Sequence, residues 1–275
     1  MSVPPDSAGR QRLVRADAAI LRRWAPPLLL LAVLVAIWEL VVRLLAVPAW
    51  LLPAPSAVAH TMGAERDLLL GNARVTLLEV VVGFALALTV GLLLAFLIDA
   101  SPTLDRAVYP LVVASQTVPV PAIAPLLLIW FGYGLLPKVL VTALIGFFPI
   151  VVATVDGLRA ADRETLAMLR AFGANGRTLF RLVRLPAALP AIFSGAKIAI
   201  TVCVIGAVFG EFVGAREGLG YLLTRAIAQF RTDRVIAAVV LLSLMGIGLF
   251  LVVSLLEGLL LPWRRYVTDS SADAR

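Results

Sequence analysis

The side chains that most often do chemistry in proteins are scarce in this chain. Its 275 residues include one histidine, His60, and one cysteine, Cys203, which rules out a multi-histidine metal site and an internal disulfide. The sequence contains no Gly-x-x-x-x-Gly-Lys-Ser/Thr phosphate loop, no His-Glu-x-x-His zinc motif and no intramembrane aspartate pair. This pattern argues against an ATPase, a metalloenzyme and an aspartyl protease, and we expect neither a catalytic residue, a metal nor a cofactor.

Several carboxylates nevertheless lie inside long apolar stretches. Glu39 precedes Arg43 by four residues, the spacing of an intrahelical ion pair, and we expect this pair to form. Glu79 and Glu211 have no such neighbour, and a carboxylate in an apolar span usually faces a partner or a wet cavity. Two interpretations of Glu211 stay open: a gate or pathway residue, and a structural hydrogen bond to a neighbouring helix.

One apolar stretch is interrupted by four prolines. They are Pro110, Pro119, Pro121 and Pro125. Proline removes a backbone donor and breaks a helix, and such a break survives in a membrane only where protein or water shields it. Ser115, Gln116 and Thr117 lie beside Pro119 and can bond the freed carbonyls or line a transport pathway. A pathway and a purely structural kink both remain possible here.

The composition shows what must position these residues. The chain is 61% hydrophobic and 15% charged, and its mean hydropathy is +1.00, so the bilayer must be its solvent. A crossing helix needs roughly 20 apolar residues, and six stretches reach about that length. They lie near 27–46, 75–98, 107–131, 136–155, 191–213 and 236–260. We therefore predict an all-α, polytopic membrane protein, whose first stretch is a retained span and not a cleaved signal peptide.

The arginines predict the orientation of the chain. Its net charge of +7 comes from cations clustered between apolar runs, which indicates topology signals and lipid contacts, not nucleic-acid binding. About twice as many cations flank the two ends and the loop at 156–190 as occupy the opposite loops. We expect a cytoplasmic tail at 1–26, a membrane domain at 27–261, a cytoplasmic tail at 262–275 and a cytoplasmic loop at 156–190.

The long cytoplasmic loop has a two-helix pattern. Apolar residues recur at helical spacing from Asp156 to Phe172, Gly173 is placed to end that helix, and Asn175 can start a second one. We expect Pro186 to stop the second helix. An apolar face on such a loop must pack on the membrane domain or dock into a partner.

This loop resembles the signature loop of bacterial ABC import permeases, Glu-Ala-Ala, three residues, Gly, nine residues, Ile, one residue, Leu-Pro. Gly173 is followed after nine residues by Val183, Arg184, Leu185 and Pro186, which matches the second half of that motif. Ala167, Met168 and Leu169 replace Glu-Ala-Ala, and Glu164 lies three residues earlier. In that family the loop forms the coupling helix that enters a cleft of the ATPase, so apolar docking is favoured over a glutamate ion pair. The resemblance implies these coupling residues: Glu164, Leu166, Ala167, Met168, Leu169, Gly173, Ala174, Val183, Leu185 and Pro186.

Further fragments resemble the nitrate, sulfonate, taurine and bicarbonate branch of that family. They include LLLIWFGYG at 126–134 and GEFVGA at 210–215, and the likeness extends over about residues 50–265. The resemblance implies a permease of the bacterial inner membrane that pairs with a second copy. It also implies two separate ATPase subunits and an extracytoplasmic substrate-binding protein as partners.

The sequence gives less support to three other functions. A secondary carrier driven by an ion gradient usually has an internal repeat, and none is evident. A membrane-embedded enzyme needs a reactive cluster that the sequence lacks, and a scaffold leaves the proline-interrupted stretch unexplained.

The sequence leaves the substrate open between sulfonate, nitrate or taurine types and thiamine-precursor pyrimidines. The arginines of the outer loop after Gly214 slightly favour an anionic substrate, although contact with a binding protein explains them equally well.

Overall fold

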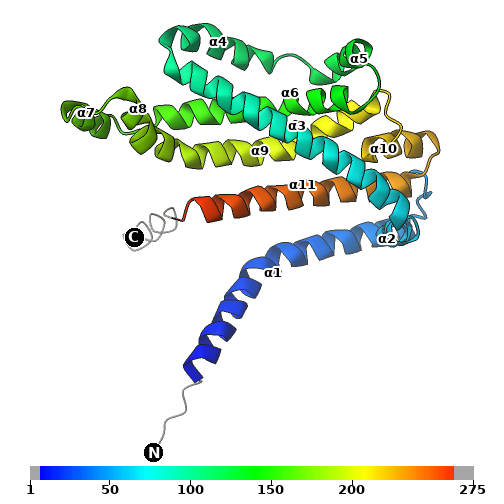
Figure 1. The fold of residues 1–275 in the computed structure, drawn as a ribbon. Helices are drawn as coiled ribbons and strands as arrows, with labels where there is room; N and C mark the ends of the chain where they lie inside the picture. Colours follow the sequence, from blue (N-terminus) through cyan, green and yellow to red (C-terminus); the bar gives the residue numbers. More distant parts are fainter. Residues whose placement is uncertain (1–6, 263–275) are drawn as a thin grey trace, which may run out of the picture.

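The structure is a computed structural model that describes the backbone of residues 7–262 and the side chains of residues 25–262. All regular structure in this range is helical (Figure 1). The elements are α1 (Ser7–Leu44), α2 (Pro55–Ala64), α3 (Arg66–Ala100), α4 (Pro102–Ser115), α5 (Val120–Phe131), α6 (Leu135–Arg159), α7 (Arg163–Ala171), α8 (Gly176–Leu179), the π turn η1 (Phe180–Arg184), α9 (Leu185–Phe212), α10 (Leu219–Ala228) and α11 (Thr232–Leu260). The arginines predicted to mark the two tails, from Arg10 to Arg23 and from Arg264 to Arg275, lie outside the described side chains.

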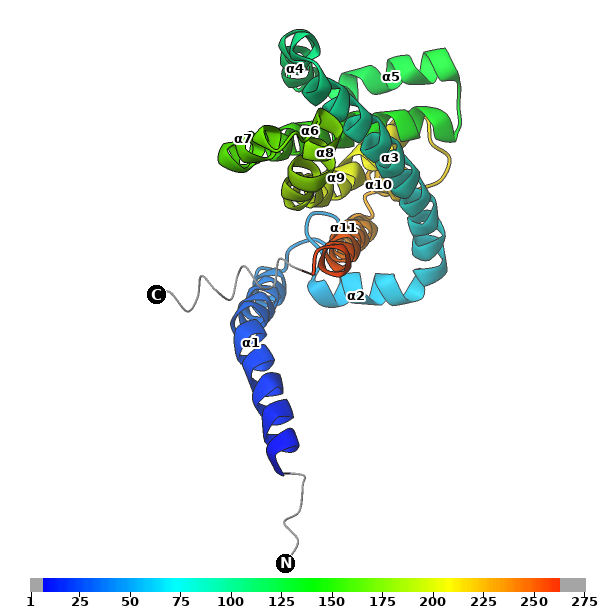
Figure 2. The same ribbon diagram turned by 60° about the vertical axis from the view of Figure 1, so that its left-hand side comes forward.

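Within the described residues, five helices are long and apolar enough to cross a membrane, and the pair α4 and α5 makes a sixth if its two halves form one span. The predicted all-α membrane architecture is confirmed. α3, α6, α9 and α11 form the bundle, while α1 leads away from it (Figure 2). In α1, Leu28, Leu29, Leu30 and Leu31 are each more than half exposed, as suits a helix that faces lipid.

The centre of the bundle is held by small residues. α6 and α9 pack most extensively, and a side chain added at Gly195 would begin 2.7 Å from the carbonyl oxygen of Pro149. On α3, a face that includes Gly83 and Gly91 packs against α6: a β-carbon at Gly83 would lie 2.4 Å from Thr142, and one at Gly91 2.9 Å from Ile150. Without small residues at these positions, the helix backbones could not approach so closely.

The predicted break in the third span is confirmed. α4 ends at Ser115, α5 begins at Val120, and the two axes are bent by 98°. Pro119 lies at the cap of α5 with extended backbone angles, so the helix cannot run through it. The bend leaves α4 and α5 on one side of the α6–α9 pair (Figure 1).

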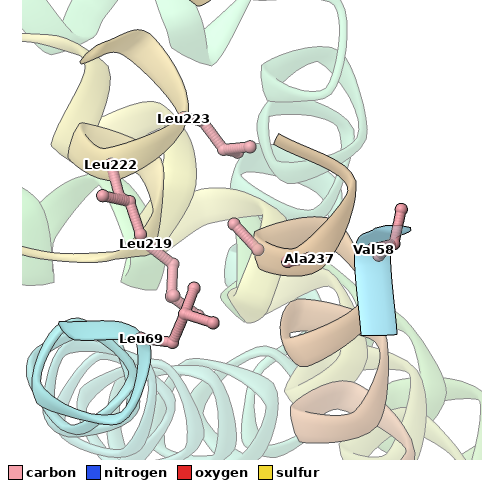
Figure 3. Close-up of a cluster of buried hydrophobic side chains, with 7 residues drawn as sticks. Val58, Leu69, Leu219, Leu222, Leu223 and Ala237 are labelled. Atoms are coloured by element: carbon pink, nitrogen blue, oxygen red, sulfur yellow. The ribbon is translucent and has the colours of Figure 1, made fainter. Parts of the chain in front are cut away.

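The two ends of the bundle are built differently. At one end α2, α10 and the first turns of α3 and α11 enclose a buried apolar cluster (Figure 3), whose members include Val58, Leu69, Leu219, Leu222, Leu223 and Ala237. At the opposite end α7 and α8 project beyond the bundle, on the same side as the end of α11 (Figure 1). The first end is closed by its own side chains, and the second presents a helical hairpin.

Two expectations for this hairpin are wrong. The helix predicted from Asp156 to Phe172 is interrupted at 160–162, because the side chain of Asp162 caps a new helix, α7, by accepting hydrogen bonds from its first amides. Pro186 does not stop the second helix. It lies in the first turn of α9, where a proline needs no hydrogen-bond donor, and the preceding residues form a π turn.

Candidate functional site

The α7–α8 hairpin is shaped by three local signals. Asp162 accepts hydrogen bonds from the backbone amide and the hydroxyl of Thr165, at 2.9 and 2.5 Å. Gly173 has φ +82°, and the amides of Gly173 and Ala174 donate to the carbonyls of Arg170 and Leu169. This is a Schellman ending, which requires the left-handed conformation that glycine adopts without strain.

Asn175 completes the turn. Its side-chain oxygen accepts a hydrogen bond from the amide of Thr178 at 2.9 Å, so α8 starts where the sequence predicted. The ending at Gly173 is likewise confirmed. Local hydrogen bonds therefore fix the start of α7 and the turn between α7 and α8.

Electrostatics support the start of α7. The pKa of Asp162 is lowered because the hydroxyl and amide of Thr165 and the amide of Glu164 donate hydrogen bonds to its carboxylate. An anion at a helix N-terminus also interacts favourably with the helix dipole. The carboxylate is therefore held in its charged, capping form.

The face of α7 that points away from the bundle is available for contact. Within the described chain, α7 has no buried residue. Met168 is 53% exposed and Phe172, directly after the helix, is 82% exposed, while Glu164 and Ala167 are exposed beside them. These residues form an apolar surface with one acidic residue at its edge. We call Glu164, Ala167, Met168 and Phe172 the α7 face.

The remaining predicted coupling residues support this face and are less accessible. Leu166 and Leu169 are half-buried on the inner side of α7, and Ala174 is half-buried in the turn. Val183 is half-buried in the π turn. Leu185 packs against a cluster of Leu158, Ala188 and Ile192, next to the half-buried Pro186. The first part of the motif, at Ala167 and Met168, is thus exposed on the surface, and its Leu185-Pro186 end anchors the segment to the bundle.

Sequence reasoning placed Phe172 in the helical pattern but missed it as a site residue. It is the most exposed large apolar side chain described in the protein. The sequence could have indicated its exposure, because a polar loop offers few apolar residues against which an aromatic side chain before a helix-ending glycine can be buried. Its spacing from Met168, one helical turn, also places both on one surface.

The break between α4 and α5 is a second candidate site. Ser115 and Gln116 line a cavity of about 190 Å³, together with side chains from α5 and α6. The hydroxyl of Ser115 donates to the carbonyl of Val112 at 2.7 Å, and that of Thr117 to the carbonyl of Ala114 at 2.8 Å. The predicted bonds to freed carbonyls are therefore present, and the pathway role of Ser115, Gln116, Thr117 and Pro119 stays a prediction.

Glu211 lies at another place, near the end of α9, and is 1% exposed. Its carboxylate accepts hydrogen bonds from the hydroxyl of Thr76 on α3, at 2.6 Å, and from the amides of Gly220 and Tyr221 on α10. A β-carbon at Gly218 would collide with this carboxylate, at 2.2 Å. Glu211 thus binds the start of α10 to α3, which is the structural alternative raised for it; a gating role stays a prediction.

Glu79 has the partner that a membrane carboxylate requires. Lys138 of α6 donates to its Oε1 at 2.6 Å, and the two side chains are 13% and 1% exposed, respectively. The predicted pair of Glu39 and Arg43 is also confirmed, at 2.5 Å, and Glu39 further accepts hydrogen bonds from Ser56. Over residues 25–262 no three His, Cys, Asp or Glu side chains are grouped to hold a metal ion.

Comparison with known proteins places these features in a family. Residues 87–266 match the family described as "Binding-protein-dependent transport system inner membrane component". The formylaminopyrimidine transport permease protein ThiX of Halalkalibacterium halodurans is 42% identical over 240 residues, 87% of this chain and 96% of that protein. SsuC of Bacillus subtilis, named for the transport of aliphatic sulfonates, is 31% identical over 246 residues, 88% of each chain.

A solved structure has the same fold. It is that of the methionine ABC transporter MetNI in an inward-facing conformation, whose chain matches with a TM-score of 0.57 at 22% identity. The match covers 69% of this chain and 98% of that one.

Proposed function

This chain belongs to the binding-protein-dependent transport permeases of ABC importers, and we propose that its α7 face docks a separate ATPase subunit through apolar contacts. The observation that carries this proposal is the exposure of Met168 and Phe172 on a hairpin whose shape is fixed by its own caps. An apolar surface of this kind on a polar loop marks an interaction site. The single carboxylate at its edge, Glu164, leaves little basis for an ion pair as the main contact.

We also propose the arrangement in the membrane. The cation distribution supports a cytoplasmic location for the α7–α8 hairpin, both termini and the loop at 156–190, and an outside location for the apolar cluster of α2 and α10. A second copy of the chain, two ATPase subunits and a substrate-binding protein complete the transporter. ATP-driven closure of the ATPases then moves α7 and switches the pathway between inward and outward access.

Co-purification tests the docking proposal. The double variant Met168→Ala with Phe172→Ala removes the exposed apolar side chains and leaves the capping residues Asp162 and Asn175 and the turn residue Gly173 unchanged. We expect ATPase recovery with the tagged permease to fall at least about tenfold, because a central interface aromatic commonly contributes 2 kcal/mol or more. Phe230→Ala is the matched control: it truncates a phenylalanine that is 71% exposed, against 82% for Phe172, at the other end of the bundle, and should leave recovery unchanged.

Equal recovery of the ATPase from the double variant and the control would overturn apolar docking. If Glu164→Gln alone abolished recovery, the ion pair would be the main contact. Uptake that survives ATP depletion but collapses with the proton gradient would favour the secondary carrier instead.

For the substrate, we propose a pyrimidine of thiamine-precursor type. The chain is more similar to the formylaminopyrimidine permease than to the sulfonate permease. The side chains that line the cavity at the break, Ser115 and Gln116 among them, are uncharged. A neutral cavity with hydrogen-bonding groups suits a neutral heteroaromatic solute better than an anion, which needs cationic partners.

An uptake competition assay in whole cells distinguishes a pyrimidine substrate from a taurine-type substrate. ATP-dependent uptake of labelled formylaminopyrimidine should appear on expression of this chain with its partners and persist in excess taurine. Uptake of taurine but not of the pyrimidine would overturn this assignment and leave the docking proposal intact.

A further inference from the structure

Two ion pairs join the base of the α7–α8 hairpin to the corner between α3 and α4. Arg184, the last residue of the π turn, donates to Asp99 in the last turn of α3 at 2.5 Å, and the Asp99 side chain is only 8% exposed. Arg159, the last residue of α6, donates to Asp105 in the first turn of α4. One pair thus lies on each side of Ser101, where α3 turns into α4.

An aromatic contact reinforces the first pair. The rings of Phe96 and Phe180 meet edge to face, with centroids 5.8 Å apart and planes at 88°. Phe96 and Asp99 are one turn apart on α3, and Phe180 and Arg184 are the two ends of the π turn. The π turn is therefore attached to α3 by a polar and an aromatic contact side by side. Such turns are rare and occur often at functional positions.

The second pair is more exposed but geometrically constrained. The Arg159 and Asp105 side chains are 43% and 38% exposed, and the Arg159 guanidinium also lies over the Tyr109 ring of α4, 4.9 Å from its centroid. An exposed ion pair contributes little by itself. The partly buried pair of Asp99 and Arg184 is the stronger link, because removing one partner leaves the other charge desolvated and unpaired.

These contacts form a continuous connection from the hairpin to the break. α7 leads through α8 to the π turn, the π turn holds the end of α3, and α3 passes directly into α4, whose last residue, Ser115, begins the break at 116–119. We propose that Asp99 and Arg184 are positioning residues that transmit movement of the α7 face to the α3–α4 corner and so to the break. This inference rests on the proposed docking of an ATPase on α7, and it assigns the route by which that docking reaches the pathway.

Pulsed electron paramagnetic resonance on the assembled transporter tests this route. In a Cys203→Ala background, Val118→Cys at the break and Leu244→Cys on α11 carry spin labels; both native side chains are about half exposed. With wild-type Asp99 and Arg184, adding ATP and vanadate should shift the label separation by a few ångströms, on the order of helix movements in switching proteins. With Arg184→Gln or Asp99→Asn, the shift should be lost while the complex still hydrolyses ATP.

The charge-swapped variant Asp99→Arg with Arg184→Asp separates transmission from folding. It should restore the shift, because it rebuilds the pair with the charges reversed. Arg181→Gln, which removes a neighbouring exposed arginine with no ion-pair partner among the described residues, should keep the full shift. A residue that only stabilises the fold would lower the yield of complex, but each assembled complex would still show the wild-type shift.

A full shift in Arg184→Gln overturns the inference, and so does the absence of any shift in the wild type. Failure of the wild-type permease to retain an ATPase during purification is a different result, seen before any label is read. It would contradict the docking proposal itself.

Discussion

At the scale of residues, two buried carboxylates of the described bundle have partners on other helices. Glu79 binds Lys138, and Glu211 binds Thr76 and the first amides of α10. Buried polar groups in a bilayer must be paired, so these contacts determine which helices can be neighbours. Composition predicted that the carboxylates need partners, but Lys138 lies 59 residues from Glu79 and Thr76 lies 135 residues from Glu211, and no local pattern identifies them.

Glu211 offers the sharpest test of such a contact. Glu211→Ala leaves the buried amide of Gly220 and the part-buried amide of Tyr221 without this acceptor, and a buried orphaned donor costs about 1–3 kcal/mol. We expect a lower thermal unfolding midpoint in detergent, and a smaller loss for Glu211→Gln, whose amide oxygen still accepts. If the two variants unfolded at the wild-type temperature, Glu211 would not hold α10.

The cap of α7 gives a pH prediction. Because the folded-state pKa of Asp162 lies below its unfolded value, its contribution to helix stability is complete above the ordinary aspartate pKa of about 3.9. It is lost as the pH falls through the lower folded value. Hydrogen exchange of residues 163–171 should therefore speed up, after correction for intrinsic rates, as the pH falls below about 3.9 in the wild type. In Asp162→Ala the exchange should be fast above and below this pH, and a pH response retained by that variant would contradict the cap.

At the scale of elements, the sequence was most informative where periodicity and proline act locally. The break near Pro119, the ending at Gly173 and the start at Asn175 were all predicted, because each depends on backbone chemistry within a few residues. The wrong expectations, a continuous helix through Asp162 and a stop at Pro186, concern residues that suit both a helix and its end. The side-chain cap at Asp162 starts a new helix, and the π turn carries the chain into α9 with Pro186 in its first turn.

Packing of α6 against α9 can be tested with one methyl group. Gly195→Ala would place a β-carbon 2.7 Å from the Pro149 carbonyl oxygen and 2.6 Å from Ala153, so the helices must separate. Overpacking of this kind costs about 1–3 kcal/mol, and we expect a clear drop in the unfolding temperature. Gly248→Ala is the control, since a β-carbon there meets no described atom within 4 Å; a similar drop in both would argue against the tight α6–α9 contact.

At the scale of the whole molecule, the bundle has one end closed by α2 and α10 and another that presents the α7 face (Figure 1). The sequence predicted the coupling segment through its spacing from Gly173 to Pro186. It could not show that Leu185 and Pro186 anchor the segment while Met168 and Phe172 are exposed, because burial depends on how α9 continues through the π turn. The proposed docking of an ATPase rests on this asymmetry together with membership of the permease family.

Hydrogen exchange on the permease, alone and bound to its ATPase, tests the central claim most directly, since it requires no substitution. We predict slower exchange in residues 163–174 of the complex, where the α7 face is covered, and unchanged exchange in residues 219–228 of α10 at the other end. Equal exchange of residues 163–174 with and without a bound ATPase would contradict docking through the α7 face.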